Sequence, residues 1–174
     1  MHREETVEDV TKIDSADHAA RRAKWDVRYV RLAKHISDWS KDPNAKVGAV
    51  VSNSSLGRVV GLGINGFPMN IEDDKTRLSD KKLKLNMVLH AEQNAILSSG
   101  RDSSGGNIYV YGKPVCNHCA ALIIQAGIDR VIAARPKPES ENESDWDIKG
   151  RLALEMFSEA NVRFTEIDEA WLGD

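Results

Sequence analysis

Both cysteines of the chain lie in one short stretch, PVCNHC, as Cys116 and Cys119. If a helix starts here, residues three apart place their sulfur atoms on one side of it. The positive end of the helix dipole favours the thiolate, which is the form of cysteine that binds metal. Two cysteines are too few for a disulfide framework, so their spacing favours a metal site or a redox dithiol. Two buried cysteines with a packing role alone are the third interpretation.

A histidine and a glutamate, His90 and Glu92, lie upstream in the stretch LHAEQNAI. A glutamate near the start of a helix is favoured by the helix dipole and needs no functional reason. Together with Cys116 and Cys119, however, His90 completes a set of three ligands for Zn2+, which leaves the fourth position of the metal open for water. Zinc lowers the pKa of that water to about 7, and Glu92 would move its protons without binding the metal. The two stretches together predict a catalytic zinc site.

Such a site needs two helix starts held side by side, and the hydrophobic pattern supplies them within an alternation of helices and strands. The expected elements, in chain order, are a helix over 25–39, strands over 47–51 and 58–63, a helix within 86–100, a strand over 108–112, a helix over 116–127, a strand over 129–134, a helix over 151–161 and a strand over 162–167. This order predicts an α/β protein with one mixed five-stranded sheet flanked by helices.

Three segments lie outside this alternation. Residues 1–22 are polar and charged, and we expect an N-terminal arm, either mobile or a peripheral helix, before a single domain over 23–174. Residues 66–84 are expected to form a loop whose basic residues are solvated or, in a nucleotide deaminase, partly neutralise a phosphate or an effector. The loop over 135–149 is rich in acidic residues, which would repel a phosphate, and we therefore expect it at the periphery or at an interface.

Length, composition and charge exclude several classes of protein. The 174 residues are enough for one domain, and no apolar run approaches the ~20 residues that a membrane span requires. The first residues lack the apolar core of a secretory signal, so we expect a cytoplasmic protein. The net charge of −3 argues against a dedicated nucleic-acid-binding protein, while a local basic pocket for one phosphate is compatible with it.

The stretches SKDPNAKVGAVV, GLGINGFP, LHAEQNAI and CNHCAALIIQAGI resemble the deoxycytidylate (dCMP) deaminases of the cytidine-deaminase-like superfamily. An H-x-E stretch followed by P-C-x-x-C is also the general signature of the zinc nucleobase deaminases. The resemblance covers residues 25–133 and implies a three-layer α-β-α fold, one Zn2+ per subunit and hydrolysis of a cytosine amino group. It assigns His90, Cys116 and Cys119 to the metal and Glu92 to acid–base catalysis.

The resemblance also implies a substrate and its contacts. It indicates a small-molecule nucleotide, dCMP converted into dUMP and ammonia, and a homo-oligomeric enzyme. The backbone amide of Ala91 would contact the base, and the side chain of Asn65 would bind the sugar. Gly66 would let the backbone approach the ligand closely. Lys46, just before a strand, is a candidate for the substrate phosphate and equally a solvated lysine.

The chain departs from the family pattern at Pro114. The family places this proline directly before the first cysteine, whereas Val115 intervenes here. We expect the turn into the helix over 116–127 to differ from that of the family. This turn would lie near the base of the substrate and its 5-substituent. The alternatives to dCMP are therefore a 5-substituted cytosine nucleotide, another aminated base, or adenosine in tRNA. A non-catalytic zinc module, closed by a fourth protein ligand, is the alternative outside enzymes.

Overall fold

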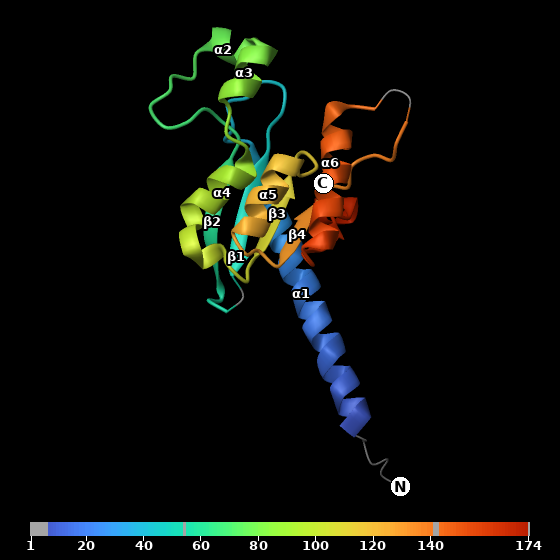
Figure 1. The fold of residues 1–174 in the computed structure, drawn as a ribbon. Coiled ribbons are helices and arrows are strands. Elements are labelled where there is room, and N and C mark those ends of the chain that lie inside the picture. Colours follow the sequence, from blue (N-terminus) through green and yellow to red (C-terminus); the bar gives the residue numbers. More distant parts are fainter. Residues whose placement is uncertain (1–6, 54, 141–142, 174) are drawn as a thin grey trace.

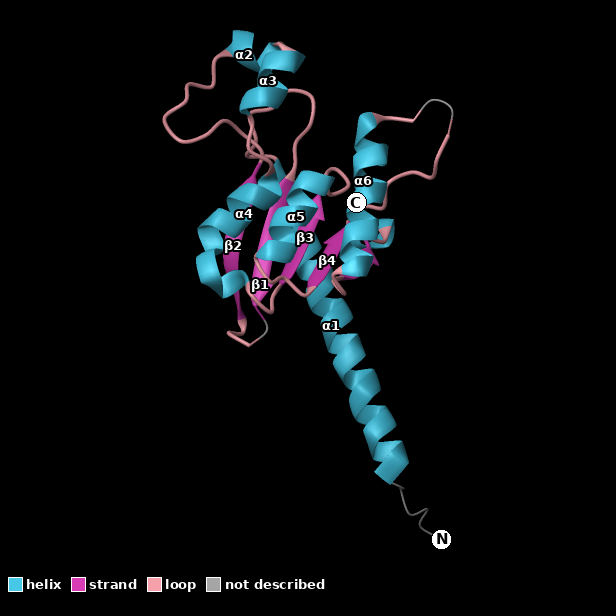
Figure 2. Cartoon of the chain, viewed as in Figure 1, coloured by secondary structure: helices cyan, strands magenta, loops and turns pink. Residues whose placement is uncertain are grey.

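A computed structural model describes residues 7–53, 55–140 and 143–173. Its elements, in chain order, are α1 Val7–Ser37, β1 Gly48–Asn53, β2 Arg58–Ile64, α2 Lys75–Ser79, α3 Lys81–Met87, α4 Ala91–Ser99, the 3-10 helix η1 Gly100–Ser103, β3 Asn107–Tyr111, α5 Asn117–Gln125, β4 Arg130–Ala133, α6 Asp145–Glu159, β5 Arg163–Glu166 and the 3-10 helix η2 Glu169–Trp171. Figures 1 and 2 show the strands side by side with helices around them.

The five strands form one mixed sheet in the order β2-β1-β3-β4-β5. Strand β1 is antiparallel to both β2 and β3, whereas β3, β4 and β5 are parallel to one another. The parallel connections run through α5 and α6, as parallel strands require a crossover. The predicted mixed five-stranded sheet is therefore confirmed.

Helices cover both faces of this sheet. Alternate residues of β3 show the division, because Ile108 and Val110 pack with α4, α5 and α6, whereas Tyr109 packs with α1 on the other face. Each face has its own buried cluster, so the protein has three layers, α-β-α, as predicted. Among the helices of the described residues, none combines the length and apolar character needed to cross a membrane.

Two glycines of β2 bring α4 into close contact with the sheet. A Cβ atom at Gly63 would lie 2.1 Å from the carbonyl oxygen of Ala91 and 2.3 Å from the amide nitrogen of Ala95. A Cβ atom at Gly61 would lie 2.3 Å from the Ala95 carbonyl oxygen. All three distances are far below van der Waals contact, so only glycine lets helix and strand pack this closely. The GLG stretch thereby fixes where α4 starts.

The structure distinguishes the two expectations for the N-terminal segment and differs from the expected elements in the charged segment. Residues 7–22, expected as a mobile arm or a peripheral helix, are helical and continue α1, and Figure 1 shows this part extending away from the sheet. Residues 1–6 of the expected arm lie outside the described residues. The expected loop over 66–84 contains α2 and the start of α3, because Asp74 and Asp80 cap these helices by accepting hydrogen bonds from Thr76 and Leu83 amides.

Helix α6 also begins earlier than expected, at Asp145 rather than at residue 151. Ser144 caps it, since its hydroxyl accepts a hydrogen bond from the amide of Asp147 at 3.2 Å. Asp145 and Asp147 lie in the first turn, where the helix dipole favours negative charge. Part of the acidic segment that was expected as a loop is therefore helical.

Candidate metal and catalytic site

The starts of α4 and α5 lie next to each other on one face of the sheet. His90 is the residue before α4, Cys116 is the residue before α5, and Cys119 lies in the first turn of α5. The amide of His90 donates a hydrogen bond to the Gln93 side chain at 2.8 Å, which holds the start of α4. The structure thus brings together the three residues that the sequence predicted as metal ligands, the only such group among the described residues.

The geometry of this cluster fits a tetrahedral zinc ion. The His90 Nδ1 atom lies 3.3 Å from the Cys119 sulfur and 3.5 Å from the Cys116 sulfur, and all three ligand atoms lie within 4.8 Å of one another. Zinc bonds of about 2.0 Å to nitrogen and about 2.3 Å to sulfur, at the tetrahedral angle, place nitrogen and sulfur about 3.5 Å apart. Two thiolates and one imidazole are also a preferred zinc ligand set.

The two cysteines of the cluster and the neighbouring Glu92 are buried, whereas His90 is half-buried. Cys116 and Cys119 are almost completely inaccessible to solvent, and Glu92 is 4% exposed. Asn117, between the ligands in sequence, has a buried side-chain oxygen with no hydrogen-bond partner within the described part of the chain. Such an acceptor in a native protein calls for a partner. A bound molecule at the cluster would supply one.

The two thiols affect each other's protonation. A hydrogen bond from the Cys119 thiol lowers the pKa of Cys116 to about 4, although burial opposes this change. The same hydrogen bond, and then burial, raises the pKa of Cys119. The two sulfur atoms therefore lie close together, and the Cys116 thiol loses its proton more readily than the Cys119 thiol. A metal cation that both sulfur atoms bind favours the thiolate form of both.

The carboxyl group of Glu92 lies beside the cluster. Burial raises its pKa, and the neighbouring His90 imidazole works in the opposite direction. The Cys119 thiol lowers the pKa of Glu92, and the Glu92 carboxyl raises that of Cys119, so the two groups lie close together. Its place in the first turn of α4, two residues after His90, is the one expected for an acid–base group beside a metal ligand.

The predicted substrate-binding residues fall into two groups. Ala91 and Gly66 lie near the ligands, because Ala91 is the first residue of α4 and the backbone of Gly66 pairs with Leu89, the residue before His90. A Cβ atom at Gly66 would meet no atom within 4 Å, so there is open space beside it. Lys46, in contrast, is exposed, and its ammonium group donates to the Asp38 carbonyl oxygen at 3.1 Å.

Asn65 is buried, and its side chain holds the preceding loop. Its Oδ1 atom accepts from the Val47 amide at 2.8 Å, and its Nδ2 atom donates to the Ala45 carbonyl oxygen at 2.8 Å. The side-chain amide therefore fixes the loop that leads into β1. A direct contact between Asn65 and a sugar stays a prediction.

The same loop is held by a buried ion pair that the sequence did not reveal. The Lys84 ammonium lies 2.8 Å from the Asp42 carboxylate, and each side chain is only 6% exposed. Asp42 also accepts hydrogen bonds from the amides of Asn44 and Ala45. The prediction that the lysines of 66–84 are solvated is therefore wrong for Lys84, since α3 brings it into contact with Asp42.

Helix α6 contributes a residue beside the metal ligands. The Trp146 ring lies edge-on to the His90 ring, with 5.4 Å between the ring centres. The Cys116 hydrogen bond raises the pKa of His90, and burial and, more weakly, the Lys149 ammonium oppose it. Both Trp146 and Lys149 thus lie near the cluster, so the expected peripheral position of 135–149 is wrong for 145–149. The helix-cap sequence S-D-W-D could have revealed a helix start here, but not its contact.

Pro114, the displaced proline, packs against this same helix. A Cβ atom at Gly150 would lie 3.3 Å from Pro114 and 2.8 Å from Pro136. Gly150 therefore lets α6 pack against both prolines. The departure from the family pattern lies where the α5 start and α6 meet, next to the ligands.

Comparison with known proteins identifies the family. Residues 23–135 match the model of the "Cytidine and deoxycytidylate deaminase zinc-binding region". A relative from Aliivibrio fischeri, described as an uncharacterized deaminase in the luxG 3' region, is 38% identical over 82% of this chain and 93% of its own length. Human deoxycytidylate deaminase is 40% identical over 81% of this chain and 78% of its own length.

Solved structures agree on the fold. The dCMP deaminase of cyanophage S-TIM5, in apo form, superposes with a TM-score of 0.61 at 24% identity, covering 83% of this chain and 98% of that one. Acinetobacter baumannii RibD superposes with a TM-score of 0.57 at 19% identity, covering 82% of this chain and 35% of that one. With the matching family model and the near 40% identity of the relatives, the chain belongs to the cytidine and deoxycytidylate deaminase family and is a hydrolytic deaminase.

Proposed function

We propose that this enzyme is a zinc-dependent dCMP deaminase, which converts dCMP and water into dUMP and ammonia. The observation that carries the proposal is the buried His90–Cys116–Cys119 cluster with Glu92 beside it. The 40% identity to human deoxycytidylate deaminase supports the substrate. A cyanophage enzyme of the same fold, whose structure is known with dCMP and dUMP, supports the same nucleotide pair.

His90, Cys116 and Cys119 would hold the zinc ion, and no fourth protein ligand joins them among the described residues. When bound, zinc acts as a Lewis acid and lowers the pKa of a water molecule, so that hydroxide is available as the nucleophile at neutral pH. This arrangement favours catalysis over a purely structural metal site.

Glu92 would carry the protons of the reaction. Its carboxylate takes a proton from the attacking water and delivers it to ring nitrogen N3, because attack at carbon C4 places electrons there. It then transfers the second proton of the water to the exocyclic amino group, which leaves as ammonia while the C4 carbonyl forms. The proton count balances with one carboxylate, which ends the cycle as it began.

The substrate contacts follow from the backbone around the cluster. The Ala91 amide, at the start of α4, is placed to hydrogen-bond the base, and the open space at Gly66 leaves room for the nucleotide. Asn65 holds the loop that borders this space and is proposed for the sugar. Lys46, which is exposed at the same loop, is proposed for the phosphate.

The test is an ammonia-release assay with the zinc-loaded protein over cytosine and adenine nucleosides and nucleotides. We expect turnover of dCMP, and a loss of more than about 100-fold in kcat for Glu92→Gln with zinc retained. Glu159→Gln, an exposed glutamate at the end of α6, is the matched control and should keep full activity. Full activity in Glu92→Gln would contradict the mechanism.

The position of Pro114 favours a second candidate, a deaminase of a 5-substituted cytosine or of another aminated base. Pro114 contacts Gly150 of α6, and α6 also carries Trp146 against His90. A change in the contact between Pro114 and Gly150 would shift α6 and therefore the side of the proposed substrate site that lies next to His90. The same assay with 5-substituted dCMP separates the candidates. Deamination of adenosine in tRNA, with no turnover of any free nucleoside or nucleotide, would reject both candidate functions.

A homo-oligomer remains part of the proposal. We propose that a second subunit contacts the N-terminal part of α1, which extends away from the sheet (Figure 1). Sedimentation velocity of the zinc-loaded protein tests this, and a monomer at micromolar concentration would contradict it.

A further inference from the structure

The cluster of proposed metal ligands is open to solvent on one side. Cys116, Cys119 and Glu92 are buried, whereas His90 is half-buried. His90 is therefore the part of the site that solvent reaches. A molecule that enters from solution has to approach the metal position along the His90 ring.

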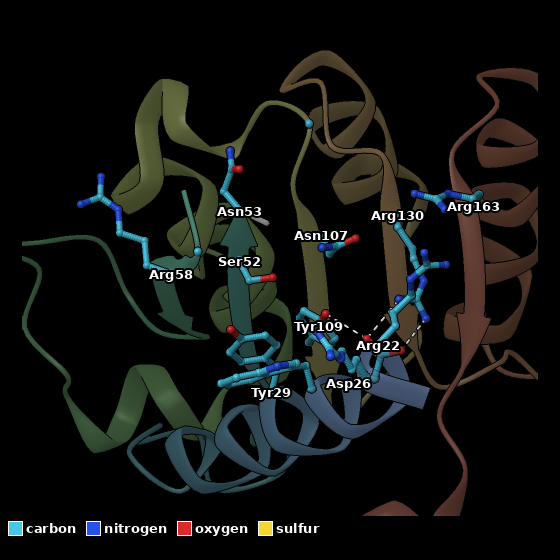
Figure 3. Close-up of a pocket in the computed structure, with 14 residues that line it drawn as sticks. Arg22, Asp26, Tyr29, Ser52, Asn53, Arg58, Asn107, Tyr109, Arg130 and Arg163 are labelled. Atoms are coloured by element: carbon cyan, nitrogen blue, oxygen red, sulfur yellow. Dashed lines mark hydrogen bonds and ion pairs between the residues drawn. The ribbon is translucent and has the colours of Figure 1, made fainter. Parts of the chain in front are cut away.

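A cavity of about 570 Å³ between α1 and the sheet does not lead to this site. It lies on the face of the sheet opposite the cluster, and none of the described residues that line it is a proposed metal ligand. Figure 3 shows its polar side chains, among which Arg130 and the Tyr109 hydroxyl donate hydrogen bonds to the Asp26 carboxylate. These bonds tie α1 to β3 and β4. The substrate therefore has to approach from the other face of the sheet.

The indole ring of Trp146 lies beside the approach along His90. The two rings are edge-on to each other, with 5.4 Å between their centres and 70° between their planes. Trp146 packs against the larger buried cluster of the protein, but its side chain is only partly buried. One part of the indole is thus held by the core, and another part borders the space next to His90.

The packing of α6 fixes where this ring lies. Trp146 is in the first turn of α6, and Gly150 follows it by four residues, so both lie on the same face of the helix. A Cβ atom at Gly150 would lie 3.3 Å from Pro114 and 2.8 Å from Pro136. Pro114 is two residues before Cys116. The contact that seats α6 on the segment before α5 therefore also directs the face with Trp146 to the metal ligands.

The helices place Glu92 and Trp146 on different sides of the cluster. Glu92 belongs to the start of α4 and Trp146 to the start of α6, and α5 lies between these helices and contacts both (Figure 2). In the proposed mechanism, Glu92 delivers a proton to N3 of the base, which is one ring neighbour of C4. The other ring neighbour is C5. A base whose N3 faces Glu92 therefore turns C5 away from α4 and toward the side of α6.

We propose that Trp146 contacts the base of the substrate on the side of C5 and limits the size of the 5-substituent that the enzyme accepts. This inference rests on the proposed deamination of dCMP and names the residue that sets its preference at C5. A close-packed wall does not shrink to admit a larger group, so a substituent that meets the indole has to displace the ring or the base. One additional carbon at such a wall typically changes kcat/KM by about 10- to 200-fold.

This role differs from the support that Trp146 gives to the His90 ring. A residue that only orients a metal ligand affects every substrate by the same factor, because all of them react at the same metal. A residue that contacts C5 affects 5-substituted substrates selectively. The ratio of kcat/KM between a 5-substituted substrate and dCMP therefore separates the two roles. Electronic effects of the substituent cancel when this ratio is compared between variants.

The test compares dCMP, 5-methyl-dCMP and 5-propynyl-dCMP as substrates of the parent protein and of Trp146→Phe, each saturated with zinc and checked for metal content. Phenylalanine keeps an aromatic ring against His90 but leaves more space. We expect the parent protein to prefer dCMP, and Trp146→Phe to raise the ratio of 5-propynyl-dCMP to dCMP at least about tenfold. Trp146→Ala, in excess zinc, should raise this ratio further while its kcat for dCMP falls.

The matched control is Trp171→Phe, because Trp171 is a partly buried tryptophan that packs in the hydrophobic cluster on the opposite face of the sheet. It makes the same change in side-chain volume on the other side of the sheet from the metal ligands. Its ratio should stay within about twofold of the parent protein. Melting temperatures of the three variants show whether each keeps the fold.

The outcomes separate a failure at C5 from a failure of the proposed function. An unchanged ratio in both Trp146 variants, with dCMP turned over, would overturn the contact at C5 and leave the dCMP deaminase function standing. A parent protein that prefers 5-propynyl-dCMP to dCMP would overturn the contact as well. No turnover of any cytosine nucleotide by the zinc-loaded parent protein would instead refute the proposed function, and the role of Trp146 at C5 with it.

Discussion

Trp146 lies outside the proposed ligand set but contacts the proposed ligand His90. Its ring lies edge-on against His90, whose Nδ1 atom faces the two sulfurs. A metal-binding histidine needs neighbours that fix its ring, and such neighbours are typically worth 10–100-fold in metal affinity or activity. The contact crosses from α6 to the start of α4, so it also ties two helices together.

We expect Trp146→Ala to lower zinc affinity by about tenfold, because the His90 ring loses the contact that fixes its orientation. Trp146→Phe keeps an aromatic ring at this position and should stay close to the parent protein. Competition for zinc with a colorimetric chelator measures both. Unchanged affinity in the alanine variant would show that the rest of the structure orients His90.

At the scale of elements, the site depends on how closely α4 packs against β2. Gly63→Ala places a methyl group 2.1 Å from the Ala91 carbonyl oxygen, so α4 must move away from the strand. We expect a fall in melting temperature together with a large loss of activity, because His90 and Glu92 start this helix.

Gly66→Ala is the matched control for Gly63→Ala, since its methyl group would meet no atom within 4 Å. We expect its melting temperature to stay near that of the parent protein. A raised KM for dCMP in this variant would support the proposed role of Gly66 in nucleotide binding. Equal melting temperatures for the two variants would mean that β2 does not fix the position of α4.

The contact between α3 and the loop before β1 depends on one lysine. Lys84→Met leaves the Asp42 carboxylate buried without its partner, and breaking a buried pair in this way costs about 3–5 kcal/mol of unfolding free energy. The double variant Lys84→Met/Asp42→Asn should be less destabilised, because no buried charge remains. Urea denaturation measures both, with Lys81→Met as the exposed control. A loss no greater than that of Lys81→Met would contradict the buried pair.

The sequence was sufficient for the parts of the site that are local. His90, Glu92, Cys116 and Cys119 lie at two helix starts, and the two stretches together predicted three metal ligands and one acid–base group. Lys84 could not be predicted in the same way, because its neighbours Lys81 and Lys82 are exposed and only the packing of α3 onto Asp42 buries it.

The sequence was also insufficient for the contact of Trp146 and for the extent of α1. The contact of Trp146 with His90 joins residues far apart in sequence, which no local pattern specifies. The polar residues 7–22 show only weak helical periodicity, so the sequence left a mobile arm and a peripheral helix as alternatives, and the structure has them in α1.

At the scale of the whole molecule, a metal would join α4 to α5 inside the larger buried cluster. Removing zinc with a chelator should therefore lower the melting temperature, by roughly 5–10 °C for zinc present at ~100 times its Kd. Differential scanning fluorimetry measures the shift, and added zinc should reverse it. Cys119→Ser, which lacks one ligand, should show a smaller shift on chelation. An unchanged melting temperature in the parent protein would contradict a bound metal at this cluster.

The separation of the ligands along the chain sets the order in which the site can form during synthesis. Cys116 follows His90 by 26 residues, and β3 lies between them. The β1–β2 hairpin and α4 leave the ribosome first, while the two cysteines are still inside the exit tunnel or not yet made. A nascent chain can therefore bury α4 against the hairpin before the proposed metal ligands Cys116 and Cys119 have emerged.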